Sequence, residues 1–389
     1  MFIKGQPLQK EDIKNILIIQ LGDIGDVVWV TPTLRATKEK YPKARVSVLV
    51  HEGFGTLLEE DPSLHKIFEV RRYKGSFFKK AIEQIRSIRG LRKEHFDLVF
   101  DLRAGDRGAI MAYITGAPVR VSMFYRDVPF WRNMLFTHVV DPPAPPERIL
   151  GAAEQSLRIV KEFGIDTENT VPKLWVSENV KEQAWQLLDR QNVSKINRHG
   201  LEKGLKKPSP LMGEGWGEGE KHQRWITLNP FSRWQYKEWG YDKWVQIMGW
   251  VWDTYGLSTV IVGSPEEKDK ASELTKKCRG RVFNLAGQTT LGELAGVLSL
   301  SFLHVGVDSA APHIAAAVGA PTITIYGPSD WRDWAPPGDN HRVVIPDDAC
   351  VPCHQKGCNS TGWSKCLQNL GTDKVQRAIQ EMMDRLTPR

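Results

Sequence analysis

The stretch VDSAAPHIAAA at residues 307–317 joins two segments with opposite structural preferences. The apolar run before it, residues 298–307, has the β-branched and aromatic content of a buried parallel strand, and the alanine-rich part after it favours a helix. Asp308 and Ser309 therefore lie where a strand ends and a helix begins. Two interpretations are open here. Either residue caps a core helix in which His313 is a buried imidazole, or the helix start binds an anionic, hydroxyl-rich ligand.

A second strand-to-helix junction lies near the N-terminus. Residues 16–21, ILIIQL, predict a short apolar strand that runs directly into Gly22-Asp23-Ile24-Gly25-Asp26 and a helix. The glycines allow a tight turn and the close approach of a ligand, and Asp23 and Asp26 lie at the helix entrance. The spacing is not that of the dinucleotide fingerprint, so no nicotinamide cofactor is implied. Both carboxylates would also complement the helix dipole without any role in chemistry.

Strand-like and helix-like segments alternate along most of the chain, which predicts doubly wound parallel α/β sheets. A chain of 389 residues is too long for one core and fits two such domains. We place the first domain at residues 1–172 and the second at 173–371, because a proline-bearing extended segment separates them. Residues 195–223 are glycine-rich, charged and without periodicity, which predicts a mobile insertion. The amphipathic helix within residues 372–389 is expected to pack back on the first domain.

Charged and hydroxyl side chains recur where predicted strands end, which is where open α/β sheets bind ligands. In the first domain, Arg103 and Arg107 follow such a strand and would meet an acceptor, unless their loop is only solvated. In the second domain, Lys237 precedes a predicted helix, where an ammonium and helix N–H groups could hold a phosphate. An exposed lysine beside a structural tryptophan is the simpler alternative. Ser329 follows a later strand and could hydrogen-bond a phosphate or a sugar hydroxyl.

The overall charge narrows the classes of partner. Lysine and arginine total 53 against 46 acidic residues, a net charge of +7 and a pI near 9.0. This mild excess suits anionic substrates or a membrane face, and the lack of a nucleic-acid-binding module or long basic block disfavours nucleic acid. No run of about eighteen apolar residues predicts a membrane span. Residues 1–14 lack the apolar core of a signal peptide, so a cytoplasmic location is expected.

Residues 120–132 mix arginines with aromatic side chains. This composition suits a surface that faces a membrane or a lipid-linked acceptor. The aromatic residues could equally pack the domain interior.

Four of the five cysteines lie in residues 350–366, at Cys350, Cys353, Cys358 and Cys366. A C-x2-C pair followed by two further cysteines could close a tetrahedral zinc site, which with four thiolates would be structural and not catalytic. No second C-x2-C pair is present, so two local disulfides or four free thiols are the alternatives. Cys278 is expected to be a buried core thiol.

Several of these motifs, taken in order, resemble the bacterial ADP-heptose:lipopolysaccharide heptosyltransferases, glycosyltransferase family 9. The matching segments are LIIQLGDIGDV at 17–27 with TPTL at 31–34, KEW at 237–239, VDSA and HIAAA within 307–317, and YGPS at 326–329. The resemblance covers roughly residues 14–386, with an interruption at 195–223. The Asp-Ser-Ala form at 308–310 and the cysteine-containing tail are most like the heptosyltransferase III branch.

The resemblance implies the GT-B fold, in which two Rossmann-like domains face each other. It also implies an inverting transfer of heptose from ADP-heptose to a hydroxyl of the lipopolysaccharide inner core, with no cofactor required for catalysis. By this match Asp26 is the catalytic base, whereas Asp23 falls outside the matching position, and Lys237 holds the leaving diphosphate. The implied donor-binding groups are Asp308, Ser309, the N–H groups of Ala310 and Ala311, His313, Ser329 and, for the ribose, Glu266.

The family more often has threonine and glycine where Ser309 and Ala310 stand, which leaves the donor sugar open. A lipid-anchored acceptor implies peripheral association with the cytoplasmic face of the inner membrane. Two alternatives to the heptosyltransferase are a related transferase that uses another nucleotide sugar and a non-catalytic nucleotide-sugar-binding protein of the same fold.

Overall fold

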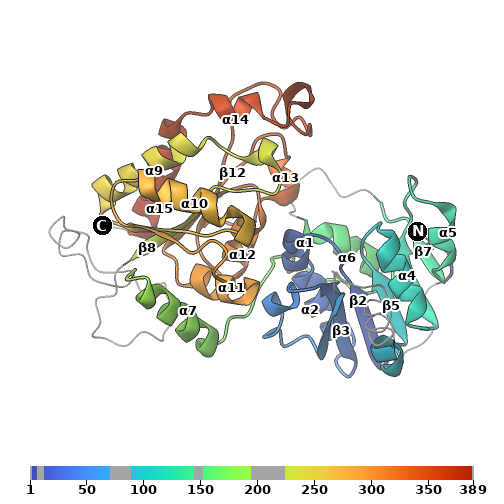
Figure 1. The fold of residues 1–389 in the computed structure, drawn as a ribbon. Helices are drawn as coiled ribbons and strands as arrows, with labels where there is room; N and C mark the ends of the chain where they lie inside the picture. Colours follow the sequence, from blue (N-terminus) through green and yellow to red (C-terminus); the bar gives the residue numbers. More distant parts are fainter. Residues whose placement is uncertain (1, 7–12, 71–88, 144–151, 194–223, 388–389) are drawn as a thin grey trace, which may run out of the picture. The chain divides into compact units, whose positions relative to one another are not determined.

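The computed structural model describes residues 2–6, 13–70, 89–143, 152–193 and 224–387. The predicted insertion at 195–223 lies outside these residues. The chain divides into two compact units, residues 1–175 and 176–389. The boundary between them thus follows Trp175, whereas the sequence predicts a boundary after Pro172. Each unit is described by itself below (Figure 1).

The first unit is built on a seven-stranded sheet of order β1-β7-β6-β5-β2-β3-β4. All neighbouring strands are parallel except β1 and β7. Its elements are β1 (Phe2–Lys4), β2 (Asn15–Ile19), α1 (Ile24–Trp29), α2 (Thr31–Lys40), β3 (Arg45–His51), η1 (Gly55–Leu57), β4 (Lys66–Val70), β5 (Leu98–Asp101), α4 (Asp106–Ile114), β6 (Val119–Met123), α5 (Phe130–Met134), β7 (His138–Val140) and α6 (Ala153–Lys161).

The second unit contains a six-stranded, fully parallel sheet of order β10-β9-β8-β11-β12-β13. Figure 1 shows α9, α10 and α15 on one face of this sheet and α7, α11 and α12 on the other. The elements are α7 (Glu178–Arg190), β8 (Trp225–Asn229), η2 (Gln235–Lys237), α9 (Tyr241–Tyr255), β9 (Ser258–Ile261), η3 (Pro265–Glu267), α10 (Lys268–Lys277), β10 (Val282–Asn284), α11 (Leu291–Ser299), β11 (Leu303–Val307), α12 (Ala310–Ala317), β12 (Thr322–Ile325), α13 (Trp331–Trp334), β13 (His341–Val344), η4 (Cys358–Ser360), α14 (Lys365–Asn369) and α15 (Thr372–Leu386).

The central strands of both sheets are buried, β2 from its second residue onward and β11 along its whole length. Such strands are apolar because helices cover both faces of a parallel sheet. The predicted doubly wound, parallel-sheet architecture is therefore confirmed in each unit. None of the helices in the described parts of the chain combines the length and apolar character needed to cross a bilayer.

The C-terminal helix α15 packs on its own unit. It contacts α9 and β13, and its buried side chains Val375, Ile379, Met382 and Met383 belong to the core of the second unit. The apolar face of α15 thus belongs to the core of the second unit, and packing of this helix on the first domain stays a prediction. The i, i+4, i+7 spacing correctly showed one apolar face, but such a face does not specify which core it joins.

The segment 120–132 is divided by the structure into a buried and an exposed part. Its beginning belongs to strand β6, where Val121 is fully buried, and Arg132 on α5 is also fully buried. Phe130, by contrast, is 80% exposed. Each of the two alternatives therefore holds for a part of this stretch: Val121 and Arg132 pack in the interior, and Phe130 faces the exterior.

Candidate functional site

In the first unit, the predicted base Asp26 lies at the carboxyl end of strand β2. Asp23 is the N-cap residue of α1, and its backbone N–H donates to Asp26 Oδ2 at 2.8 Å. A side chain at Gly22 would place its Cβ 2.3 Å from the same oxygen, so glycine is needed for the carboxylate to fold back over the turn. Asp26 is 8% exposed, and Asp23 is exposed. The turn therefore holds one of its two carboxylates in a fixed, nearly buried position.

Arg103 is brought to Asp26 by the order of the strands. Strands β2 and β5 are neighbours, with Ile19 opposite Asp101, so the loops after them leave the sheet side by side. Arg103 Nη1 lies 3.0 Å from Asp26 Oδ1 and forms an ion pair with it. Arg107, the other predicted acceptor-side residue, is exposed in the first turn of α4. Of the two arginines, Arg103 is thus the one whose contact with the candidate base is defined.

The first unit also contains a second ion pair, which is fully buried and was not predicted from the sequence. Asp101, the last residue of β5, accepts a hydrogen bond from Arg132 Nη2 at 2.9 Å, and both side chains are 0% exposed. Burial raises the pKa of Asp101 to about 7, with the Arg132 guanidinium acting in the opposite direction. A side chain at Gly108 would place its Cβ 2.4 Å from Asp101 Oδ1, which shows how tightly the carboxylate is enclosed.

In the second unit, the candidate donor site is centred on Asp308 at the carboxyl end of β11. Lys237, at the end of the short turn η2 that follows β8, places its Nζ 2.7 Å from Asp308 Oδ2. Strands β8 and β11 are neighbours, so their loops meet at one edge of the sheet. The Lys237 and Asp308 side chains are 21% and 7% exposed. The structure therefore brings together two of the predicted residues as a partly buried ion pair.

Ser309 is the N-cap residue of α12, but its side chain does not cap the helix. Its hydroxyl instead donates to Asn229 Oδ1 at 2.7 Å, and Asn229 Nδ2 donates to the carbonyl of Val262. The helix N-terminus at Ala310 and Ala311 thus has no side-chain cap, which is the geometry that suits an anionic ligand. Asn229 was missed by the sequence analysis, although a polar residue at the end of an apolar strand was the available signal.

Two buried side chains lie close to the Lys237–Asp308 pair. Burial lowers the pKa of His313 to about 4, with opposing smaller effects from Asp308 and Lys237, so the imidazole is neutral near pH 7. Tyr326, directly after β12, is fully buried, and burial and the nearby Asp308 raise the pKa of its hydroxyl. Ser329 lies further along the same loop and is half-buried. The wall around the ion pair is therefore largely uncharged.

The predicted ribose residue Glu266 is exposed on η3, after strand β9. The carboxylate of the neighbouring Glu267 contacts the loop after β9, where its Oε2 accepts from the backbone N–H of Ser264 at 2.6 Å. Burial raises the pKa of Glu267, and the proximity of Glu238 acts in the same direction. Glu238 is itself 8% exposed and accepts from Ser232 N and Tyr241 Oη. These two carboxylates were not predicted.

The four clustered cysteines do not form the predicted metal site. Cys350, Cys353, Cys358 and Cys366 are free thiols, and among the residues that the structure describes no three His, Cys, Asp or Glu side chains are grouped to hold a metal ion. Cys366 is buried in the core of the second unit, where burial raises the pKa of its thiol to about 11, whereas Cys350 is exposed. Of the three alternatives that the spacing left open, the described residues thus show four free thiols.

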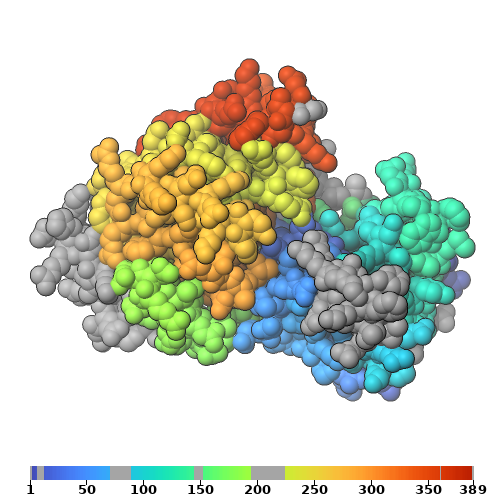
Figure 2. All heavy atoms as spheres, in the orientation of Figure 1, coloured from blue at the N-terminus to red at the C-terminus, as the bar shows by residue number. Residues whose placement is uncertain are grey.

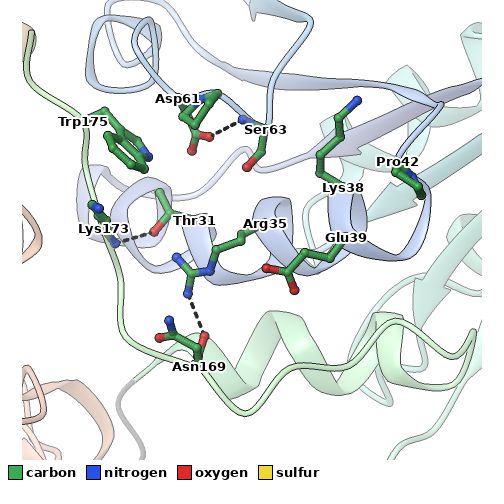
Figure 3. A pocket seen from close by; sticks show the side chains of 11 residues that line it. Thr31, Arg35, Lys38, Glu39, Pro42, Asp61, Ser63, Asn169, Lys173 and Trp175 are labelled. Carbon is green, nitrogen blue, oxygen red and sulfur yellow. Dashed lines mark hydrogen bonds between the residues drawn. The ribbon is translucent and has the colours of Figure 1, made fainter.

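A polar pocket of about 430 Å³ lies elsewhere in the first unit, along α2 (Figure 3). Arg35 donates from Nη2 to the carbonyls of Asn169 and Val171 at 2.7 and 3.2 Å, and Lys173 N donates to Thr31 Oγ1. None of the predicted site residues lines it. Its polar groups tie the segment before α7 to α2, which gives this pocket a structural explanation.

Comparison with known proteins identifies the fold and then the family. The solved structure of a family 9 glycosyl transferase from Veillonella parvula aligns with a TM-score of 0.74 at 18% identity, covering 96% of this chain and 98% of the other. The E. coli ADP-heptose lps heptosyltransferase II aligns with a TM-score of 0.71 at 18% identity, covering 95% and 99%. These likenesses show that the two parallel-sheet units have the GT-B architecture.

The sequence profile of Glycosyltransferase family 9 (heptosyltransferase) matches residues 84–364. The chain therefore belongs to glycosyltransferase family 9, the heptosyltransferase family, and is an enzyme. Among characterised relatives, E. coli lipopolysaccharide heptosyltransferase 3 is 27% identical over 319 residues, which cover 80% of this chain and 84% of the relative.

Proposed function

We propose that the protein transfers heptose from ADP-heptose to a hydroxyl of the lipopolysaccharide inner core, with inversion at the anomeric carbon. The observation that carries this proposal is the Lys237–Asp308 pair beside the N-terminus of α12. A cation next to helix N–H groups is the arrangement that a diphosphate leaving group requires. The names of the heptosyltransferase 3 and heptosyltransferase II relatives support the lipopolysaccharide acceptor and the ADP-heptose donor.

In the proposed reaction, an acceptor hydroxyl attacks the anomeric carbon of the donor sugar. Asp26 takes the hydroxyl proton while the new carbon–oxygen bond forms. The bond between the anomeric carbon and the diphosphate oxygen breaks, and ADP leaves with the electron pair. Lys237 and the N–H groups of Ala310 and Ala311 stabilise the charge that develops on the diphosphate. Because attack and departure occur on opposite faces of one carbon, the anomeric configuration inverts.

The direct test is incubation of the protein with ADP-heptose and a core-truncated lipopolysaccharide. We expect release of ADP and an acceptor heavier by one heptose, measured by mass spectrometry, with an anomeric configuration opposite to that of the donor by NMR. Transfer from a different nucleotide sugar alone would point to a related transferase. Binding of ADP-heptose without any product, across a panel of acceptors, would instead favour a non-catalytic binding protein.

For the acceptor side, we propose contact with an anionic bilayer at the cytoplasmic face of the inner membrane through a defined surface. The α4–α5 patch consists of four exposed apolar side chains on two helices that pack together: Ile110 (44% exposed), Tyr113 (56%), Phe130 (80%) and Met134 (67%). Figure 2 shows the segment that carries α4 and α5, in the teal part of the colour series, on the molecular surface. Exposed Arg107 precedes the α4 part of the patch in the sequence and exposed Arg126 precedes the α5 part, which suits anionic headgroups.

Replacement of Phe130 and Met134 by serine is expected to lower partitioning onto anionic vesicles by roughly tenfold or more, since each side chain loses part of its ~1.5–3 kcal/mol of apolar burial. The measurement is vesicle co-sedimentation, together with kcat/KM for a lipid-anchored acceptor and for its delipidated oligosaccharide. Only the lipid-anchored acceptor should be affected. Trp363→Ser, at a side chain that is 45% exposed in the second unit, is the matched control. Unchanged partitioning of the double variant would contradict this surface.

A further inference from the structure

The buried Asp101–Arg132 pair is difficult to explain as a stabilising feature alone. Arg132 donates only through Nη2, and its Nε and Nη1 have no hydrogen-bond partner among the described residues. The guanidinium lies over the rings of Tyr125 and Phe136, at 5.2 and 5.1 Å from their centroids. A buried charge pair with unsatisfied donors is generally no more stable than a well-packed apolar pair of similar volume. Its presence here calls for a second explanation.

The contacts of Arg132 lead directly to the candidate base. The same Nη2 that pairs with Asp101 also donates to the backbone carbonyl of Arg103 at 2.5 Å and to Ser122 Oγ at 3.2 Å. Arg103 N in turn lies 3.4 Å from Asp101 Oδ1. The backbone of Arg103 is thus bound on both sides by the buried pair, while its side chain reaches Asp26 at 3.0 Å.

We propose that Arg132, held by Asp101, is a positioning residue that fixes the backbone of Arg103 so that the Arg103 guanidinium holds the Asp26 carboxylate in its reactive orientation. This inference rests on the proposed role of Asp26 as base. Arg132 and Asp101 touch no reacting atom in this scheme, because both side chains are completely buried. They act through three elements at once, the ends of β5 and β6 and helix α5, which meet at the guanidinium.

The planar guanidinium explains why arginine stands at this position. One terminal nitrogen contacts a carboxylate, a carbonyl and a hydroxyl, and the planar group lies over the rings of Tyr125 and Phe136. A lysine ammonium could pair with Asp101 but has no planar surface for Tyr125 and Phe136. Arg132→Lys should therefore keep the charge pair and lose part of the positioning.

The test is a kinetic cycle with a structural readout. Single removal of Arg132 would leave Asp101 buried and unpaired, so the main variant is the neutral double replacement Asp101→Asn/Arg132→Met. We expect kcat of the double variant to fall about 10- to 100-fold, with KM for donor and acceptor changed less than threefold. The kcat of Arg132→Lys should lie between those of the wild type and the double variant. Arg103→Ala should cost little further activity in the double variant although it costs much in the wild type, because both changes remove the same contact. The matched control is Lys161→Met/Asp166→Asn, which removes an ion pair of the same unit from the surface and should leave kcat unchanged.

A crystal structure of the double variant gives a readout that does not depend on turnover. We expect the Arg103 guanidinium to leave Asp26 while the sheet is unchanged. If Arg103 Nη1 stays within hydrogen-bond distance of Asp26 Oδ1, or if the kinetic effects of Arg103→Ala and the double replacement are additive, the positioning role is overturned. Absence of heptosyl transfer by the wild type would overturn the proposed function instead, and the structural comparison would still decide the positioning role.

Discussion

Replacement of Asp26 by asparagine is expected to lower kcat by about 10²–10⁴-fold, the range that general-base catalysis usually contributes. Asparagine has nearly the same shape and can still accept the hydrogen bond from Asp23 N, but it cannot take a proton from the acceptor hydroxyl. Binding of ADP-heptose should change little, because the proposed donor groups Lys237 and Asp308 belong to the second unit. The measurements are initial rates at saturating substrates and calorimetric titration of ADP-heptose without acceptor.

The matched control for Asp26 lies on the same turn. Asp23 is exposed at the N-cap position, where its backbone N–H donates to the Asp26 carboxylate and its own carboxylate accepts from the backbone N–H of Asp26, a capping contact that asparagine can keep. Asp23→Asn should therefore retain kcat within a few-fold of the wild type. Two results would contradict the assignment of the base: a near wild-type rate for Asp26→Asn, or equal losses for the two variants.

The positions of Asp26 and Asp308 could be predicted from the sequence for one physical reason. Buried parallel strands are continuous apolar runs, so the polar residue that ends each run stands out. In a parallel sheet all such ends lie at the same edge, and Asp26 follows β2 at this edge of the first sheet, whereas Asp308 follows β11 at this edge of the second sheet. The family resemblance added the roles, which remain predictions for each residue.

The side-chain contacts that join neighbouring strand ends in each unit could not be predicted, because they depend on strand order. Arg103 contacts Asp26 only because β5 pairs with β2, and Asn229 contacts Ser309 only because β8 pairs with β11. Local sequence does not encode which strands become neighbours.

Arg132 could not be predicted for a further reason. It lies in a stretch whose arginines and aromatics suggested a surface, and a buried arginine is rare unless it is paired.

The cysteine cluster shows the limit of spacing as a guide. Spacing fixes how far apart ligands are along the chain, but a metal site requires that the side chains converge. Cys366 instead turns into the apolar core of the second unit while Cys350 faces the exterior. The same limit applies to the C-terminal helix α15, because its sequence predicts an apolar face but does not specify the core that this face joins.

Replacement of Lys237 by methionine is expected to lower kcat by about 10²–10³-fold, the usual effect of removing one group that stabilises developing negative charge. The same change leaves Asp308, 7% exposed, without its 2.7 Å partner, and should destabilise the protein by about 1–3 kcal/mol. Activity and stability must therefore be separated. Kinetics with ADP-heptose and thermal unfolding measure the two effects on the same sample.

The double replacement Lys237→Met/Asp308→Asn separates the effect on activity from the effect on stability, because it removes the unpaired buried charge. We expect unfolding to return toward the wild-type temperature while kcat stays low, since no cation is left to meet the departing diphosphate. Lys243→Met is the matched control in the same unit. Its ammonium donates to the carbonyls of Gln368 and Leu370, so its loss should lower stability and leave kcat unchanged. If the double variant recovers transfer together with stability, Lys237 serves only to neutralise Asp308, and the charge that develops on the leaving ADP must be met by the N-terminus of α12 alone.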